Sequence, residues 1–170
     1  MIDDEFQEII RSNTGCAVVM AGSGSDKEHI EKVVEGLERY GIPYRVRICS
    51  AHKQADTLME MIREYNNIDG SLAFIAIAGG TDALSGTGSF HLYHPVISCP
   101  PDAPNESCLR NPPGSSNAYV ARPRNVARFI AQMYAGVNPD FRTALEEEIR
   151  GKVASLEEAD REFHESYRRE

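Results

Sequence analysis

Short apolar runs alternate along the chain with stretches in which apolar residues recur every three or four positions. Residues 16–20 form the first apolar run, and residues 72–77 are almost wholly apolar. Runs of this length indicate strands, and a run without alternating polar residues is typical of a strand covered on both faces of a parallel sheet. The same reasoning predicts strands at residues 44–49, 95–99 and 118–121.

Amphipathic helices are predicted between these strands. Ser25 and Glu28 fit a capping box, and the apolar positions after them keep helical spacing until Gly41. A second helix is predicted over residues 55–65, and Pro123 suits the first turn of a third. The alternation of strand, loop and helix predicts an α/β fold, a three-layer α/β/α sandwich with a mostly parallel, flavodoxin-like sheet.

The C-terminal tail, residues 139–168, has an apolar pattern of its own. One stripe, with members three or four positions apart among many charges, contains Leu145, Ile149, Val153, Leu156, Phe163 and Tyr167. The pattern predicts one long helix or two shorter ones, packed either on their own domain or on a neighbouring subunit. We therefore expect one domain over residues 1–170, with its core at 16–136 and an extended helical tail.

Composition narrows the class of protein. The chain has 170 residues, of which 41% are hydrophobic and 26% charged, and its apolar runs are far shorter than the roughly 20 residues of a membrane helix. Its net charge of −8 opposes nucleic acid and anionic membranes as partners. Four cysteines without a C-x-x-C pair favour buried thiols over a disulfide framework or a metal site. The acidic start resembles neither a signal nor a transit peptide, so we expect a cytoplasmic protein.

The first of three polar loops that follow predicted strands is residues 22–26. Its glycines and serines offer backbone N–H groups, two hydroxyls and a helix N-terminus, which favour an anion such as a phosphate. Asp26 is able to accept hydrogen bonds from sugar hydroxyls. The alternative is structural: Ser25 caps its helix, and the glycines only permit the turn.

The second loop contains the best acid–base candidate of the chain, His52. This histidine follows an apolar strand and stands between Ser50 and Lys53, at the edge of the sheet where such folds bind ligands. The alternative is a histidine whose hydrogen bonds are satisfied within its own loop.

The third loop is predicted over residues 79–86. Gly79, Gly80 and Gly86 permit close approach of a flat ligand, and Ser85 is able to donate a hydrogen bond to it. The alternative is a tight connection that needs positive φ values. All three loops are expected to converge on one crevice at the carboxyl ends of the strands.

Taken together and in order, these segments resemble the aminoimidazole ribonucleotide (AIR) carboxylase family of purine biosynthesis. The resemblance covers residues 16 to about 136 and rests on segments 22–26, 50–53, 78–86 and 95–101. Within the family the chain is similar to the class II type, which carboxylates AIR directly with CO2. The class I mutases, which rearrange N5-carboxy-AIR, have arginine in place of Lys53 and a second histidine near residues 83–86, whereas residues 108–114 resemble a class II segment.

The resemblance implies a reaction, a set of site residues and an assembly. The reaction is the reversible carboxylation of AIR to carboxyaminoimidazole ribonucleotide (CAIR), without metal, biotin or ATP, in a homo-octamer or homotetramer. His52 is implied to move the proton on ring carbon 4; Ser25, Ser50 and Lys53 are implied to hold the phosphate, and Asp26 the ribose. The implied substrate-binding set is Gly22, Ser23, Ser25, Asp26, Ser50, Ala51, Lys53, Gly79, Gly80, Ala83, Leu84 and Ser85.

One departure from the family pattern keeps other functions open. Class II members usually carry Gly-Arg-Ser-Asn where this chain has residues 79–82, so the arginine is replaced by Gly80 and an acidic Asp82 stands nearby. The alternatives are an N5-CAIR mutase, a nucleotide-binding protein of the same family without turnover, and a carboxylase of a different azole nucleotide. The missing second histidine speaks against the mutase.

Overall fold

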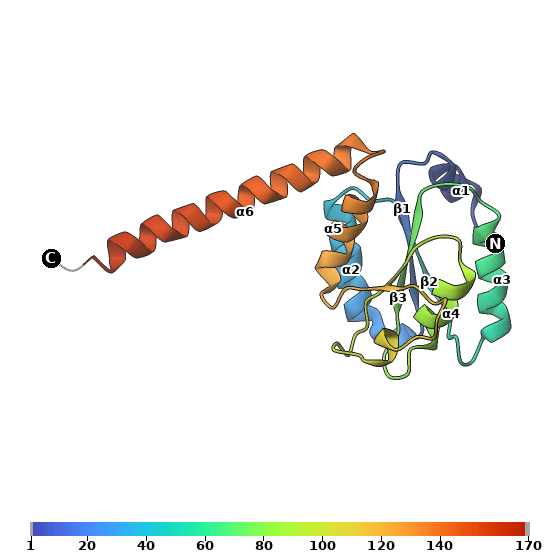
Figure 1. Ribbon diagram of the computed structural model, residues 1–170. Coiled ribbons are helices and arrows are strands. Elements are labelled where there is room, and N and C mark those ends of the chain that lie inside the picture. The colour runs from blue at the N-terminus through green and yellow to red at the C-terminus, as the bar shows by residue number, and fades with distance from the viewer. Residues whose placement is uncertain (1, 169–170) are drawn as a thin grey trace.

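A five-stranded parallel sheet forms the centre of the computed structural model, which describes residues 2–168 (Figure 1). The strands are β1 (Cys16–Ala21), β2 (Tyr44–Ile48), β3 (Leu72–Ile77), β4 (Val96–Ser98) and β5 (Ala118–Tyr119). Their spatial order is β2-β1-β3-β4-β5, and all neighbouring strands are parallel. This is the flavodoxin-like order, so the predicted fold class is confirmed.

Helices cover both faces of the sheet (Figure 1). One face is covered by α2 (Lys27–Arg39) and α5 (Pro123–Tyr134), and the other by α1 (Asp4–Arg11), α3 (Ala55–Asn66) and α4 (Ala83–His91). Two short 3₁₀ helices, η1 (Gly24–Asp26) and η2 (Ser107–Leu109), lie in loops, and α6 (Pro139–Ser166) ends the described chain.

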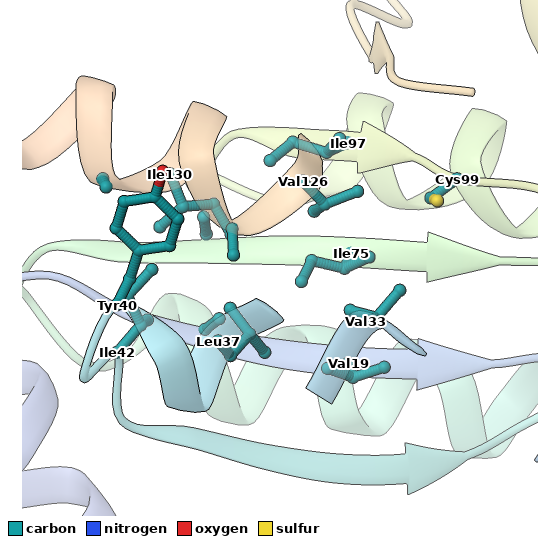
Figure 2. Packing of buried hydrophobic residues seen from close by; sticks show 14 of the residues in the cluster. Val19, Val33, Leu37, Tyr40, Ile42, Ile75, Ile97, Cys99, Val126 and Ile130 are labelled. Atoms are coloured by element: carbon teal, nitrogen blue, oxygen red, sulfur yellow. The ribbon is translucent and has the colours of Figure 1, made fainter. Parts of the chain in front are cut away.

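Burial on both faces explains the uninterrupted apolar runs of the central strands. Every residue of β1 and β3 is buried. Successive side chains of a strand point to opposite faces, so Ile75 joins the cluster under α2 and α5, whereas Phe74 joins the one under α1, α3 and α4. The first cluster includes Leu37 of α2, Val126 of α5 and Ile75 of β3 (Figure 2).

Three local features differ from the expectations. Helix α2 begins at Lys27, because η1 precedes it. Ser23, and not Ser25, is the capping residue, and it caps η1 with a hydroxyl that accepts from the Ser25 N–H. The capping box at Ser25 is therefore wrong. The third loop is shorter than expected, since α4 begins at Ala83. The sequence pattern gives no prediction for α1, yet Phe6 is wholly buried in the core.

The C-terminal tail is one continuous helix of 28 residues that projects from the body (Figure 1). Its first turns pack beside α5, where Phe141 and Leu145 are buried. Beyond them Val153, Leu156 and Phe163 are exposed, so the helix does not fold back on its own domain. Within residues 2–168 there is no helix both long and apolar enough to span a bilayer.

Candidate active site

The three predicted loops meet at a cavity of about 190 Å³. It lies at the carboxyl ends of β1, β2 and β3, which are neighbours in the sheet, so that the loops after them converge. Its lining consists of Gly22, Ser23, Asp26, Ser50, Ala51, His52, Lys53, Ala78, Gly79, Thr81, Ala83 and Leu84. All predicted site residues except Ser25, Gly80 and Ser85 are therefore in this cavity.

The first loop forms one wall through Ser23 and Asp26. The Ser23 and Ser25 hydroxyls are 2.8 Å apart and hydrogen-bonded, which orients Ser23 while Ser25 stays outside the cavity. Asp26 is the N-cap residue of α2 and has no side-chain capping bond, so its carboxylate is not used by the helix. The partial positive charge at the start of α2 lies next to it.

The second loop holds His52 in a closed turn. The N–H groups of Lys53 and Gln54 donate to the Ser50 carbonyl at 3.2 and 2.8 Å, and the Ser50 N–H donates to Gln54 Oε1 at 3.2 Å. His52 is exposed, and its imidazole makes no hydrogen bond to any residue within 2–168. The structure therefore does not support the alternative that the hydrogen bonds of His52 are satisfied within its own loop.

The third loop brings Gly79 and Thr81 to the cavity but turns Ser85 away from it. Ser85 is wholly buried, and both its N–H and its hydroxyl donate to the Asp82 carboxylate, at 2.9 and 2.6 Å. Asp82 caps α4, and burial raises the pKa of its carboxyl against these hydrogen bonds. The expectation that Ser85 faces the ligand is therefore wrong for this structure.

Glycine is required for different structural reasons at Gly80 and at Gly86. Gly80 has φ of +68°, so the alternative of a turn needing positive φ holds there. Gly86 lies inside α4, and a Cβ on it would come within 2.6 Å of Asn111 Oδ1. Gly86 therefore permits the approach of another loop, not of a ligand.

Two other histidines are half-buried and contact backbone carbonyls. His29 contacts the Cys99 carbonyl at 3.0 Å and His94 the Tyr65 carbonyl at 3.3 Å, and burial lowers the pKa of both. They are poor acid–base candidates. In the described part of the chain, residues 2–168, no three His, Cys, Asp or Glu side chains gather as metal ligands would.

Sequence reasoning missed residues that shape the cavity without local signals. Thr81 lines it directly, and Gln54 closes the His52 turn. Asp102 and Asn105, in the loop before η2, bind the backbone of Gly80. Thr81 and Gln54 could have been found, because each is a polar residue that directly follows a glycine or histidine motif. Nothing in the local pattern connects residues 102–105 with Gly80.

Larger hollows lie elsewhere on the molecule. Two, of about 370 and 240 Å³, flank the base of α6 and are lined mainly by charged residues such as Arg39, Glu148 and Lys152. They contain none of the strand-end loops. The cavity of about 190 Å³ is the better candidate for the active site, because a histidine, a lysine and an aspartate lie together there at the ligand-binding edge of the sheet.

Comparison with known proteins identifies the family. The family model described as AIR carboxylase matches residues 16–154. The chain belongs to the AIR carboxylase family. It is 37% identical over 124 residues to a phosphoribosylaminoimidazole carboxylase of Treponema denticola, covering 69% of this chain and 78% of that protein. The corresponding protein of Archaeoglobus fulgidus is 32% identical over 148 residues, covering 84% of this chain and 77% of the other.

Longer relatives and solved structures agree with this membership. A human bifunctional carboxylase and succinocarboxamide synthetase is 32% identical over 171 residues, which are 96% of this chain but only 40% of the human protein. The crystal structure of Treponema denticola PurE superposes with a TM-score of 0.81 at 31% identity. The match covers 87% of this chain and 98% of that one, so the similarity extends over nearly the whole PurE subunit.

Proposed function

We propose that this chain is an AIR carboxylase of the class II type, which converts AIR and CO2 reversibly to CAIR in purine biosynthesis. The observation that carries the proposal is the meeting of His52, Lys53 and Asp26 at one cavity in a member of this family. A titratable group, a cation and a sugar-hydroxyl acceptor are the side chains that such a ribonucleotide reaction needs.

The chemistry needs one proton to be moved. AIR is an enamine-like nucleophile at ring carbon 4, so in the carboxylation direction a carbon–carbon bond forms between carbon 4 and CO2. The neutral His52 imidazole then takes the carbon-4 proton, and the ring electrons return to restore aromaticity. In decarboxylation, protonated His52 returns that proton to carbon 4 as CO2 leaves. The exposed position of His52, without a competing hydrogen bond among residues 2–168, suits this role.

Binding is divided among the three walls. Lys53 and the N-terminus of α2 attract the phosphate, Ser50 and Ser23 add hydroxyls, and the Asp26 carboxylate accepts from the ribose. The imidazole ring and the new carboxylate lie along the 79–84 backbone, where Gly79 and Thr81 line the cavity. Ser25, which hydrogen-bonds Ser23, acts through that partner.

The working form is proposed to be a homo-octamer or homotetramer in the cytoplasm, with no nucleic acid partner. The cavity of one subunit, about 190 Å³, lies below the roughly 300–1,000 Å³ usual for small-molecule sites, and a neighbouring subunit would enclose it further. The exposed apolar side chains of α6 supply a surface for assembly. The net charge of −8 opposes binding to nucleic acid.

Ultraviolet absorbance tests the reaction directly. The protein is mixed with AIR, bicarbonate and dissolved CO2 without ATP, and in a second cuvette with N5-carboxy-AIR. We expect CAIR to form only in the first. Product from N5-carboxy-AIR alone would establish the mutase instead, and no product from either substrate would favour a binding protein or a different azole nucleotide.

Replacement of the proposed proton carrier tests its role. His52→Asn keeps the size of the side chain but removes the titrating group, so we expect kcat to fall by about a hundredfold or more while AIR still binds. The matched control is His164→Asn on the exposed face of α6, which we expect to leave kcat unchanged. Near-normal turnover by His52→Asn would exclude His52 as the proton carrier.

A further inference from the structure

The third wall of the cavity contains two adjacent glycines and has little stiffness of its own. Gly79 and Gly80 are both exposed, and Gly80 has φ of +68°. Glycine has the largest backbone freedom of any residue, so a wall built from two of them samples many conformations unless another segment holds it. Gly79 and Thr81 face the cavity on either side of Gly80, whose position therefore sets theirs.

A second segment does hold this wall, from 22 positions further along the chain. The Gly80 N–H donates to Asp102 Oδ2 at 2.8 Å, and the Gly80 carbonyl accepts from Asn105 Nδ2 at 2.9 Å. Ser107 completes the set: its hydroxyl donates to the Gly80 carbonyl at 3.2 Å and accepts from the Asp82 N–H at 2.6 Å. We call Asp102, Asn105 and Ser107 the 102–107 clamp.

The clamp is itself ordered. Asn105 is 5% exposed, its Nδ2 donates to Asp102 Oδ1 at 2.9 Å, and its Oδ1 accepts from the Ser107 N–H at 2.9 Å. The Gly80 N–H and the Asn105 amide lower the pKa of Asp102, which keeps its carboxylate ionised and able to accept from both. The segment is anchored to β4 through Asn117, which donates to Ser98 Oγ at 2.8 Å and to the Cys108 carbonyl at 2.9 Å.

We propose that Asp102 is a positioning residue for the substrate site: it fixes the Gly80 peptide from outside the cavity, so that Gly79 and Thr81 are already placed when substrate arrives. This inference rests on the proposed function for its kinetic consequence but not for its structural one. Asp102 does not line the cavity and acts only through the backbone. A wall ordered in advance loses less conformational entropy on binding, so the clamp acts on affinity more than on the chemical step.

The kinetic test separates binding from chemistry. Asp102→Ala removes both acceptor oxygens, and we expect KM for AIR to rise about tenfold. A rise of this size corresponds to part of the free energy that one hydrogen bond to a charged group contributes. We expect kcat to change little, because His52 and its turn are untouched. Asp102→Asn keeps one acceptor oxygen for the Gly80 N–H but sets its amide against that of Asn105, so an intermediate KM is expected.

Hydrogen exchange provides a readout that needs no activity. We expect amide exchange in peptides covering residues 78–85 to accelerate in Asp102→Ala, with the rest of the sheet unchanged. The matched control is Glu106→Gln in the same loop, since Glu106 is exposed and its carboxylate pairs, among residues 2–168, with Arg110 alone, at 2.7 Å. This control is expected to change neither exchange nor KM.

The outcomes distinguish the clamp from the proposed function. Unchanged exchange at residues 78–85 in Asp102→Ala, or faster exchange over the whole chain, would overturn the clamp, as would an unchanged KM in an active enzyme. If the unaltered protein forms no CAIR, the proposed function fails, and the exchange comparison between Asp102→Ala and Glu106→Gln alone decides whether Asp102 orders the wall.

Discussion

Glu148 shows how much one buried carboxylate contributes to joining α6 to the body. Its side chain is 8% exposed and accepts hydrogen bonds from Tyr40, Arg128 and Lys152, the last at 2.8 Å, with Arg39 at 3.7 Å. Burial by itself raises the pKa of this group, but the hydrogen bonds from Lys152, Tyr40 and Arg128 outweigh it and lower the pKa to about 2. The ionised form is thus the one that the folded protein prefers.

Replacing Glu148 is predicted to make stability less dependent on pH. Because the pKa falls from 4.5 in the unfolded chain to about 2 in the folded one, ionised Glu148 stabilises the fold fully above about pH 5, and the contribution is lost as the pH falls toward 2. We expect Glu148→Gln to lower the free energy of unfolding by about 2–3 kcal/mol at pH 7 and by much less at pH 3. Denaturant titrations at both pH values measure this.

The neighbouring exposed glutamate supplies the control. Glu147→Gln removes the same charge one position earlier on α6, where the side chain is exposed, and is expected to change stability by less than about 0.5 kcal/mol. An equal loss at pH 7 and pH 3 for Glu148→Gln would show that the carboxylate is not held ionised by these partners.

At the scale of elements, the start of α4 is where the third wall of the cavity passes into a helix. Asp82 is 4% exposed and accepts from the Ser85 N–H and the Ser85 hydroxyl, so it satisfies one free N–H of the first turn and one buried hydroxyl. Because Thr81 and Ala83 on either side of it line the cavity, the capping bond also fixes where the wall ends and the helix begins.

Loss of this cap is predicted to destabilise the protein. Asp82→Ala leaves the buried Ser85 hydroxyl and N–H without their acceptor, and we expect a loss of about 1–3 kcal/mol in the free energy of unfolding. Asp82→Asn is the matched variant: an amide of the same shape still caps the helix, so a loss below about 1 kcal/mol is expected. Thermal unfolding followed by circular dichroism compares them, and equal losses for the two variants would contradict a capping role.

For the whole molecule, the projecting half of α6 is the feature whose apolar side chains a single subunit leaves uncovered. The exposed residues of its stripe are spaced four, three and seven positions apart, and they are Ile149, Val153, Leu156 and Phe163. A helix with such a stripe is stable when another helix or subunit covers it. The projection in Figure 1 therefore agrees with the proposed homo-oligomer.

Charged residues on this stripe are predicted to dissociate the assembly. Val153→Glu together with Leu156→Glu places two carboxylates on the apolar face, and we expect the mass in sedimentation velocity to fall toward that of one 18.9 kDa chain. Ala154→Glu with Ser155→Glu adds the same charge beside the stripe and is the control, expected to leave the mass unchanged. An unaltered assembly in the first variant would exclude the stripe as the interface.

Local periodicity was sufficient to predict the sheet and the loops that meet at the candidate site. The apolar runs of β1 and β3 indicate strands buried on both faces, and loops after adjacent parallel strands must meet at one edge, which brings His52 to the cavity. These inferences need only the order of residues along the chain, because strand and helix periods are properties of neighbouring positions. Membership of the family follows from the same segments.

Only the tertiary structure decided which polar groups meet across the fold. Ser85 turns to Asp82 and away from the cavity, Asp102 reaches Gly80 from 22 positions away, and Tyr40 reaches Glu148 from 108 positions away. Such pairs depend on how loops and helices pack after the chain has crossed the sheet, and the pattern of either partner's own segment carries no trace of the other. The sequence therefore places the candidate site, and the packing decides which residues hold its walls.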